Sequence, residues 1–139
     1  METSVKQRAK SPSIVSIDDE EEVISIITDF FKMEGFTVQG FTDPEAAMRS
    51  LVESPNPPDV VLLDIMMPVI DGYEFCRRIQ SVPQLANVPV IFLSAKDRDD
   101  DQLGFFKAGG HLLIRKPFHL PDLKNLVLLV AQTGLQVVQ

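Results

Sequence analysis

The segment that most constrains this chain is Val60–Leu63, an unbroken apolar run that ends on the carboxylate of Asp64. A short apolar run that begins with β-branched residues is typical of a strand buried on both faces, as in a parallel sheet. Pro68 follows soon after and discourages an early return to regular structure. Because ligands bind at the carboxyl ends of the strands in open α/β sheets, the position of Asp64 alone indicates a chemical role.

Strand-like and helix-like patterns alternate along the chain. The predicted strands are Ile14–Ile17, Phe36–Phe41, Val60–Leu63, Val88–Leu93 and His111–Ile114. A helical pattern of apolar residues follows each strand, over ranges that begin near residues 20, 43, 72, 97 and 122. This alternation predicts an α/β fold, with a doubly wound five-stranded parallel sheet and helices on both of its faces.

The length of 139 residues indicates one domain, with a core large enough to need no disulfides. Residues 1–11 are polar, mildly basic and unpatterned, so we expect a disordered leader there. The domain itself is expected over residues 12–133. Residues 134–139 are expected to form a C-terminal tail or the start of a linker.

Charge, cysteine content and hydropathy limit the cellular compartment and the classes of partner that we expect for the chain. A formal net charge of −7, from 20 acidic and 13 basic residues, argues against nucleic acid as a direct partner. Cys76 is the single cysteine and cannot form an internal disulfide, and the chain opens without an apolar signal core, so we expect a cytoplasmic protein. The longest apolar run, Leu126–Ala131, is far shorter than the roughly 20 residues of a spanning helix, so no membrane span is expected.

Residues able to do chemistry follow four of the five predicted strands. They are Asp18 and Asp19 after the first strand, Asp64 after the third, Ser94 after the fourth and Lys116 after the fifth. A helix cap explains the acidic residues after Asp19 better than it explains this first pair. Taken singly, Lys116 could be a surface lysine and Ser94 a turn former, but their places at successive strand ends argue against coincidence.

These side chains, if they converge, form a set suited to phosphoryl chemistry. Two carboxylates about 4 Å apart repel by roughly 4 kcal/mol at an effective dielectric near 20, so three carboxylates favour a bound cation. Hard oxygen ligands favour Mg²⁺. A metal ion, an ammonium and a hydroxyl are the groups that stabilise a transferring phosphoryl group.

Four motifs, in this order, resemble those of response-regulator receiver domains in two-component signalling. They are Asp18–Asp19, Leu63–Pro68 with Asp71–Gly72, Leu93–Lys96 and Lys116–Phe118. Each motif alone is weakly specific, whereas all of them in sequence are highly specific, and the resemblance covers roughly residues 12–131. It implies a chemotaxis-regulator-like domain with the flavodoxin-like strand order 2-1-3-4-5.

The resemblance implies that Asp64 is the phosphoacceptor and takes its phosphoryl group from a phosphohistidine. The donor would be a histidine kinase or a histidine phosphotransfer protein. Lys116 would pair with Asp64 and then with the phosphoryl oxygens, and Ser94 would donate its hydroxyl to these oxygens and move toward them on activation. The Lys116–Pro117 peptide is expected to be cis.

The resemblance also implies a Mg²⁺ site and a role in signalling. Asp19, Asp64 and the main-chain carbonyl of Met66 would hold the ion, and Asp18 would act mainly through a bound water. The domain would be a switch that catalyses only its own phosphorylation and dephosphorylation, not an enzyme for an external substrate. About 20 residues follow Phe118, so we expect either a single-domain regulator or a fragment of a longer chain.

Leu113 departs from the family pattern. Receivers usually carry a ring three residues before the lysine, and this ring swings inward on activation, so we expect the switch to reach the last helix here by a different packing change. His111 and Leu112 stand where receivers often carry the acidic residues of a charged dimer face. Leu128 and Leu129 add apolar surface to the last helix, which predicts either a partly exposed helix or a contact with an output domain or second protomer.

Three other functions stay open on the residues alone. A pseudo-receiver would only bind proteins; the acidic residues and Lys116 argue against it, whereas Leu113 favours it. An aspartate-nucleophile phosphatase usually carries a second Asp two residues after the nucleophile, where this chain has Met66. A flavodoxin-like cofactor binder needs a phosphate loop after the first strand, where Asp18 and Asp19 stand instead.

Overall fold

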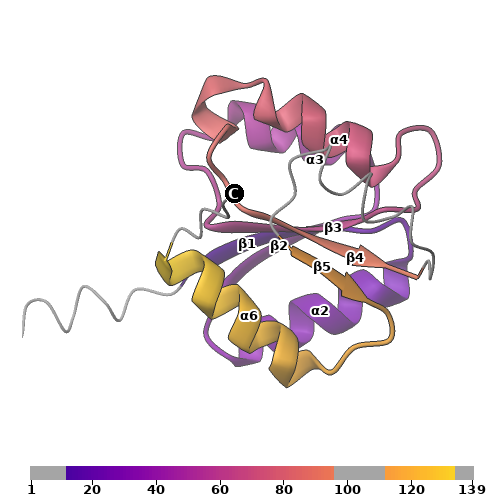
Figure 1. Ribbon diagram of the computed structural model, residues 1–139, viewed down its shortest axis with the longest axis vertical. Helices are drawn as coiled ribbons and strands as arrows, with labels where there is room; N and C mark the ends of the chain where they lie inside the picture. The colour runs from indigo at the N-terminus through magenta and orange to yellow at the C-terminus, as the bar shows by residue number, and fades with distance from the viewer. Residues whose placement is uncertain (1–11, 96–111, 134–139) are drawn as a thin grey trace, which may run out of the picture.

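A computed structural model describes residues 12–95 and 112–133 of the protein. Five strands form one parallel sheet in the order β2-β1-β3-β4-β5 (Figure 1). The strands are β1 (Ser13–Ile17), β2 (Thr37–Phe41), β3 (Val60–Asp64), β4 (Val90–Ser94) and β5 (Leu112–Arg115). The described helices are α2 (Glu21–Met33), α3 (Pro44–Glu53), α4 (Gly72–Gln80), the short 3₁₀ helix η1 (Pro83–Leu85) and α6 (Leu120–Thr133).

This architecture confirms the predicted fold class and strand order. Helices α2 and α6 cover one face of the sheet, and α3 and α4 cover the other (Figure 1). All five predicted strands are present, with ends shifted by one or two residues. The helix expected from residue 97, and His111 at the predicted start of the last strand, lie outside the described residues.

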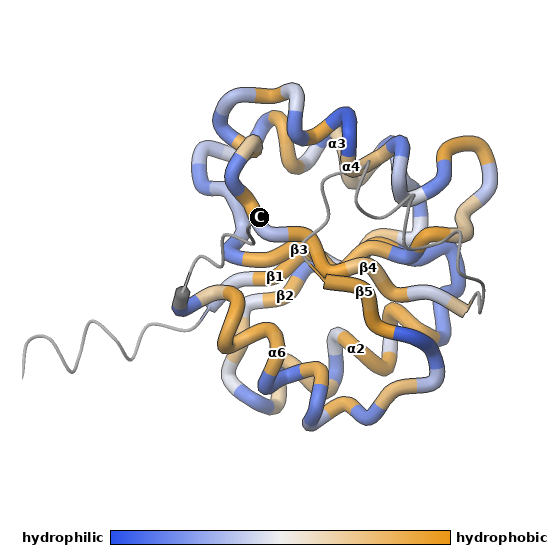
Figure 2. Tube along the Cα trace, in the orientation of Figure 1, coloured by the Kyte–Doolittle hydropathy of each residue, from blue (hydrophilic) through white to orange (hydrophobic). Residues whose placement is uncertain are grey.

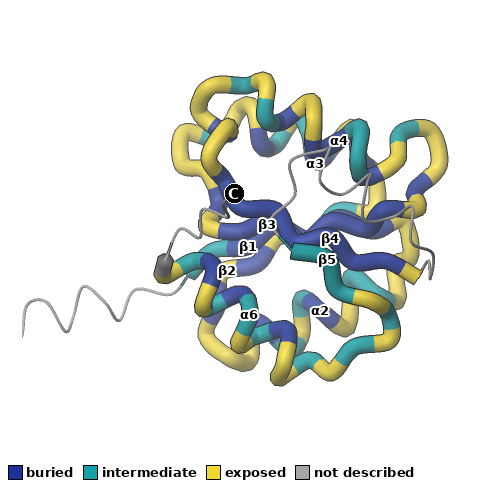
Figure 3. Tube along the Cα trace, in the orientation of Figure 1, coloured by how far each residue is buried: buried dark blue, intermediate teal, exposed yellow. Residues whose placement is uncertain are grey.

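The apolar run Val60–Leu63 lies in the central strand β3, and the burial of this strand explains why the run is unbroken. It pairs with β1 on one side and β4 on the other, and its first four residues are fully buried (Figure 3). Successive side chains point to opposite faces of the sheet, so an apolar residue is needed at every position. Asp64 is the residue at which this strand reaches the carboxyl edge of the sheet.

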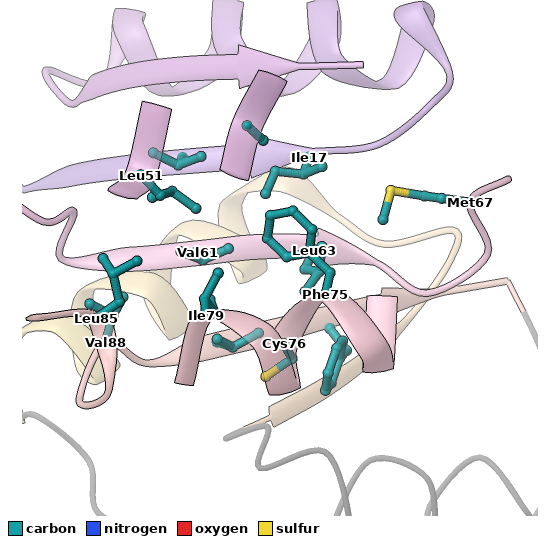
Figure 4. Close-up of a cluster of buried hydrophobic side chains, with 14 of the residues drawn as sticks. Ile17, Leu51, Val61, Leu63, Met67, Phe75, Cys76, Ile79, Leu85 and Val88 are labelled. Atoms are coloured by element: carbon teal, nitrogen blue, oxygen red, sulfur yellow. The ribbon is translucent and has the colours of Figure 1, made fainter. Parts of the chain in front are cut away.

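Two apolar cores hold the helices against the sheet, and Figure 2 shows apolar residues concentrated along the strands and on parts of the helices. The core under α3 and α4 is drawn in Figure 4, and its members include Ile17, Leu51, Leu63, Phe75 and Ile79. The core under α2 and α6 includes Ile14, Phe31, Leu62, Leu123 and Val127. Each core buries side chains from three or more strands, which fixes the relative positions of the strand ends.

An aspartate is the N-cap residue of each of the two helices on the α3–α4 face of the sheet. The Asp43 carboxylate accepts a hydrogen bond from the main-chain N–H of Glu45 at 3.1 Å, and that of Asp71 accepts one from Glu74 at 2.9 Å. Pro44 occupies the first turn of α3, where its missing N–H costs no helical hydrogen bond. Asp43 and Pro44 together therefore suit the start of α3.

The last helix, α6, begins at Leu120, two residues before its predicted start, because Pro121 is compatible with a first turn. Its buried face consists of Leu123, Val127 and Val130. Leu128 also packs partly on this core, whereas Leu129 is 50% exposed. Within the described ranges, no helix has the length and apolar character needed to cross a membrane.

Ser16 of β1 buries a hydroxyl that has no hydrogen-bond partner within the described part of the chain. A buried polar group without a partner keeps a desolvation penalty of about 1–3 kcal/mol. We therefore expect Ser16→Ala to leave the free energy of unfolding unchanged or to raise it by about 1 kcal/mol, as measured by urea denaturation.

Ser13→Ala, in the same strand, is the matched control. The Ser13 hydroxyl exchanges hydrogen bonds with Asp59, so its removal is expected to lower the free energy of unfolding by roughly 0.5–1 kcal/mol. A loss of more than about 1 kcal/mol in Ser16→Ala would show that the hydroxyl has a partner after all.

Candidate functional site

One edge of the sheet gathers the residues that the sequence singles out. Asp18 follows β1, Asp64 ends β3, Ser94 ends β4 and Lys116 follows β5. Asp18, Asp64 and Ser94 are buried, whereas Asp19 is exposed. The strands are parallel, so their carboxyl ends meet at this edge, and the predicted convergence is present.

Lys116 lies between two buried carboxylates. Its Nζ is 2.8 Å from Oδ2 of Asp18 and 3.3 Å from Oδ1 of Asp64. The Lys116 side chain is 17% exposed, and those of Asp18 and Asp64 are 1% and 5% exposed. The sequence predicts the pair with Asp64, but the shorter contact, with Asp18, is visible only in the structure. One ammonium therefore bridges two of the three carboxylates.

The main chain fixes the strand ends that carry these groups. The N–H of Lys116 donates to the carbonyl of Ser94 at 2.7 Å, and the N–H of Ile65 donates to the carbonyl of Leu93 at 3.1 Å. The Lys116–Pro117 peptide is cis, as expected. The ends of β3, β4 and β5 are thus held together by hydrogen bonds that do not depend on the charged side chains.

The three carboxylates form a cluster that could hold a metal ion. One oxygen each from Asp18, Asp19 and Asp64 lies within 4.8 Å of the others. Both oxygens of Asp18 are already engaged, Oδ1 by the main-chain N–H of Glu20 at 3.0 Å and Oδ2 by Lys116. Asp19 has no hydrogen bond or ion pair to another of the described residues, so its carboxylate is available to a ligand.

Burial and the neighbouring charges set the protonation of the central pair. Burial, followed by the charge of Asp18, raises the pKa of Asp64 to about 6, although Lys116 acts in the opposite direction. Burial disfavours the charged form of Lys116, but its hydrogen bond to Asp18 and the charge of Asp64 outweigh this and raise its pKa. Lys116 is therefore charged at neutral pH, and the site still favours a further positive charge next to Asp64.

Gly72 allows α4 to begin directly against the end of β3. A Cβ at this position would overlap the main-chain carbonyl oxygen of Asp64 and lie 2.9 Å from Cα of Ile65. The Gly72 N–H also donates to the carbonyl of Ile65 at 2.8 Å. The sequence indicates only a turn here, because the close approach of two main chains leaves no signal beyond the glycine itself. Any side chain at residue 72 would displace Asp64.

Met66 and Leu113 are the remaining predicted site residues. Met66 is 52% exposed, on the loop that follows Asp64. Leu113 is half-buried, pairs with Phe92 of β4 and packs against the α3–α4 core. Phe92 makes an edge-to-face contact with Tyr73 of α4, with ring centroids 5.1 Å apart. Aromatic rings from β4 and α4 therefore lie in the layer to which Leu113 contributes an aliphatic side chain.

A family model for the response regulator receiver domain matches residues 14–128. The chain belongs to this receiver-domain family. The transcriptional regulatory protein PrrA of Mycobacterium tuberculosis is 34% identical over 113 residues, a match that covers 81% of this chain and 47% of PrrA. The chain thus spans about half the length of this relative.

Solved structures share the fold of this chain. A chemotaxis protein of Vibrio cholerae has the same fold, with a TM-score of 0.80 at 20% identity over 86% of this chain and 98% of that chain. The receiver domain of a sensor histidine kinase from Pseudomonas aeruginosa has a TM-score of 0.80 at 25% identity, over 88% of this chain and 99% of that chain. That receiver was crystallised with a magnesium ion coordinated in its active-site cleft.

The raised pKa of Asp64 predicts how stability depends on pH. Its carboxyl has a pKa of about 6 in the folded protein, against an ordinary value of 3.8, so the folded state binds this proton more tightly than the unfolded state. The corresponding stability is fully present below about pH 4 and is lost as pH rises through about 6. Asp64→Asn cannot ionise and escapes this loss.

We expect Asp64→Asn to be more stable than the parent at about pH 7.5 in EDTA, by up to about 3 kcal/mol, and the difference to disappear near pH 4. Urea denaturation at the two pH values measures it. A gain that is the same at both values would contradict a raised pKa for Asp64.

Proposed function

We propose that this receiver domain is the phosphoacceptor of a two-component or phosphorelay system and that Asp64 takes the phosphoryl group. The observation that carries the proposal is the position of Lys116, whose ammonium contacts both Asp18 and Asp64 at the end of the central strand. An ammonium in this place can neutralise phosphoryl oxygens attached to Asp64 without leaving its pocket. Membership of the receiver family supports the same role.

Mg²⁺ is the cofactor that we propose for this site. The donors are hard oxygens, and one lysine does not neutralise three carboxylates within 4.8 Å of one another. Asp19, Asp64 and the main-chain carbonyl of Met66 would hold the ion, and Asp18 would act through a bound water because both of its oxygens already accept hydrogen bonds. When bound, the ion would offset negative charge on the transferring phosphoryl group.

The proposed donor is the phosphohistidine of a histidine kinase or of a histidine phosphotransfer protein. A carboxylate oxygen of Asp64 forms a bond to phosphorus as the bond from phosphorus to the imidazole nitrogen breaks, and the released imidazole takes up a proton. Lys116 and the hydroxyl of Ser94 stabilise the phosphoryl oxygens. Hydrolysis of the aspartyl phosphate then returns the switch to its resting state.

Two of the three other functional classes, the phosphatase and the pseudo-receiver, fit the described site less well. A phosphatase that uses an aspartate nucleophile needs an acid or base near the leaving group, and Met66, two residues after Asp64, has an exposed thioether instead. A pseudo-receiver that only binds proteins has no use for a lysine held between two buried carboxylates. Burying such charges carries a desolvation cost, and a binding module gains no chemistry in return.

The partners follow from the proposed reaction. The phosphodonor must reach Asp64 through the carboxyl edge of the sheet, and Leu129 of α6 offers an apolar contact for an output domain on a different face. We propose no direct contact with nucleic acid, given the net charge of −7. A cytoplasmic setting fits the buried free thiol of Cys76.

Intact-mass analysis tests the phosphoacceptor directly. After incubation with acetyl phosphate and Mg²⁺, we expect a labile gain of about 80 Da, the mass of one phosphoryl group, in the parent and none in Asp64→Asn. Asp71→Asn is the matched control, since it alters a nearby carboxylate that caps α4 and should keep the gain. No gain with any phosphodonor would favour the pseudo-receiver.

The aliphatic residue at position 113 generates a second test. Leu113 pairs with Phe92, whose ring contacts that of Tyr73. We therefore expect Leu113→Tyr to add amide-shift changes in β5 and α6, beyond those of the parent, when beryllofluoride and Mg²⁺ are added. Two-dimensional amide spectra measure this. Leu113→Met, of similar volume, should respond like the parent. Identical responses in the parent and Leu113→Tyr would show that residue 113 does not alter coupling.

A further inference from the structure

The exposed surface between α3 and α4 has a hollow of about 410 Å³ that lies apart from the carboxylate cluster. The apolar residues lining it include Met48, Val69, Ile70 and Phe75. The charged residues lining it are Glu45, Arg49 and Arg78. We call this region the α3–α4 surface; the two helices that form it lie together on one face of the sheet (Figure 1).

Val69 is the most unusual residue of the α3–α4 surface. It is 95% exposed, and its φ of 73° places it in the left-handed region. It is the one residue other than glycine with a positive φ in the described ranges. A β-branched residue is a true outlier in this region, and such strain costs on the order of 1–3 kcal/mol. A strained backbone of this kind is common at functional surfaces and motivates a binding hypothesis for the surface that carries it.

The charges of the same surface are only partly paired. Glu74 accepts from Arg77 at 2.8 Å and from Arg78 at 3.1 Å, so these two guanidinium groups are satisfied within α4. Glu45 and Arg49 are exposed on α3, one helical turn apart, and neither side chain makes an ion pair or hydrogen bond with another described residue. As far as the described residues go, the surface thus offers one free anion and one free cation about 6 Å apart along the helix axis.

We propose that the α3–α4 surface is an interface with a second copy of this chain, related to the first by a two-fold axis. Two α3 helices packed antiparallel across this axis place Glu45 opposite Arg49 of the second copy, and Arg49 opposite its Glu45. The same rotation brings the exposed Val69 of each copy toward the hollow beside Val69 of the other. A two-fold interface requires this kind of self-complementary patch.

A second copy is the occupant that the chemistry of the surface favours. A complementary partner presents an exposed apolar side chain, a cation and an anion. Its cation has to face Glu45 and its anion has to face Arg49. The α3–α4 surface itself has all three. The patch is small and each copy carries a net charge of −7, so we expect the association to be weak.

Charge reversal tests the pairing by sedimentation equilibrium over a concentration series. Glu45→Arg gives a surface with two cations, and Arg49→Glu gives one with two anions, so each variant alone should self-associate at least tenfold more weakly than the parent. An equimolar mixture of the two variants should recover association, because every cation then faces an anion. The double variant E45R/R49E should also associate like the parent.

Two further variants distinguish this interface from association through a different face of the molecule. Asparagine adopts the left-handed backbone more readily than valine, so Val69→Asn should raise the free energy of unfolding. It should also weaken association, because it removes the exposed apolar side chain. Leu129→Gln, on α6, should leave association unchanged. A parent that stays monomeric throughout the series, single variants that associate like the parent, a mixture that does not recover, or loss of association in Leu129→Gln would each overturn the proposal.

Discussion

The buried ion bridge from Lys116 to Asp18 and Asp64 is the interaction on which the rest of the site depends. It joins three segments that are far apart in the chain; the two carboxylates are almost fully buried, and the lysine side chain is 17% exposed. Removing Lys116 would leave two buried carboxylates without their counter-charge, at a cost of roughly 3–5 kcal/mol. The bridge is therefore both a structural clamp at the carboxyl edge and a source of charge for an incoming anion.

The loop between β3 and α4 connects this clamp to the rest of the molecule. The N–H of Ile65, the first residue of the loop, donates a hydrogen bond to the carbonyl of Leu93 in β4. The N–H of Gly72, where α4 begins, donates a hydrogen bond to the carbonyl of Ile65. Because α4 begins in contact with the Asp64 main chain, the helix and the site cannot move independently. The same loop carries Val69 to the α3–α4 surface, so one short segment serves the reactive edge and the proposed interface.

Much of the fold follows from residue patterns, but the side-chain geometry does not. The apolar run ending on Asp64 predicts a central buried strand, and the residues after the other strands identify the reactive edge. The preference of Lys116 for Asp18 over Asp64 rests on a difference of about half an ångström between two contacts, which depends on rotamers that no sequence pattern encodes. The left-handed backbone of Val69 could not be predicted from the sequence either, because this conformation is typical of glycine or asparagine and not of valine.

We propose that Lys116 and a metal ion share the three carboxylates: Lys116 contacts Asp18 and Asp64, and the metal would be held by Asp64 and by Asp19, which has no ion pair among the described residues. Isothermal titration with Mg²⁺ tests this most directly. We predict that Asp19→Asn weakens Mg²⁺ binding at least tenfold, whereas Lys116→Met, which removes the competing cation, tightens it. Unchanged affinity in Asp19→Asn, or weaker binding in Lys116→Met, would contradict this claim.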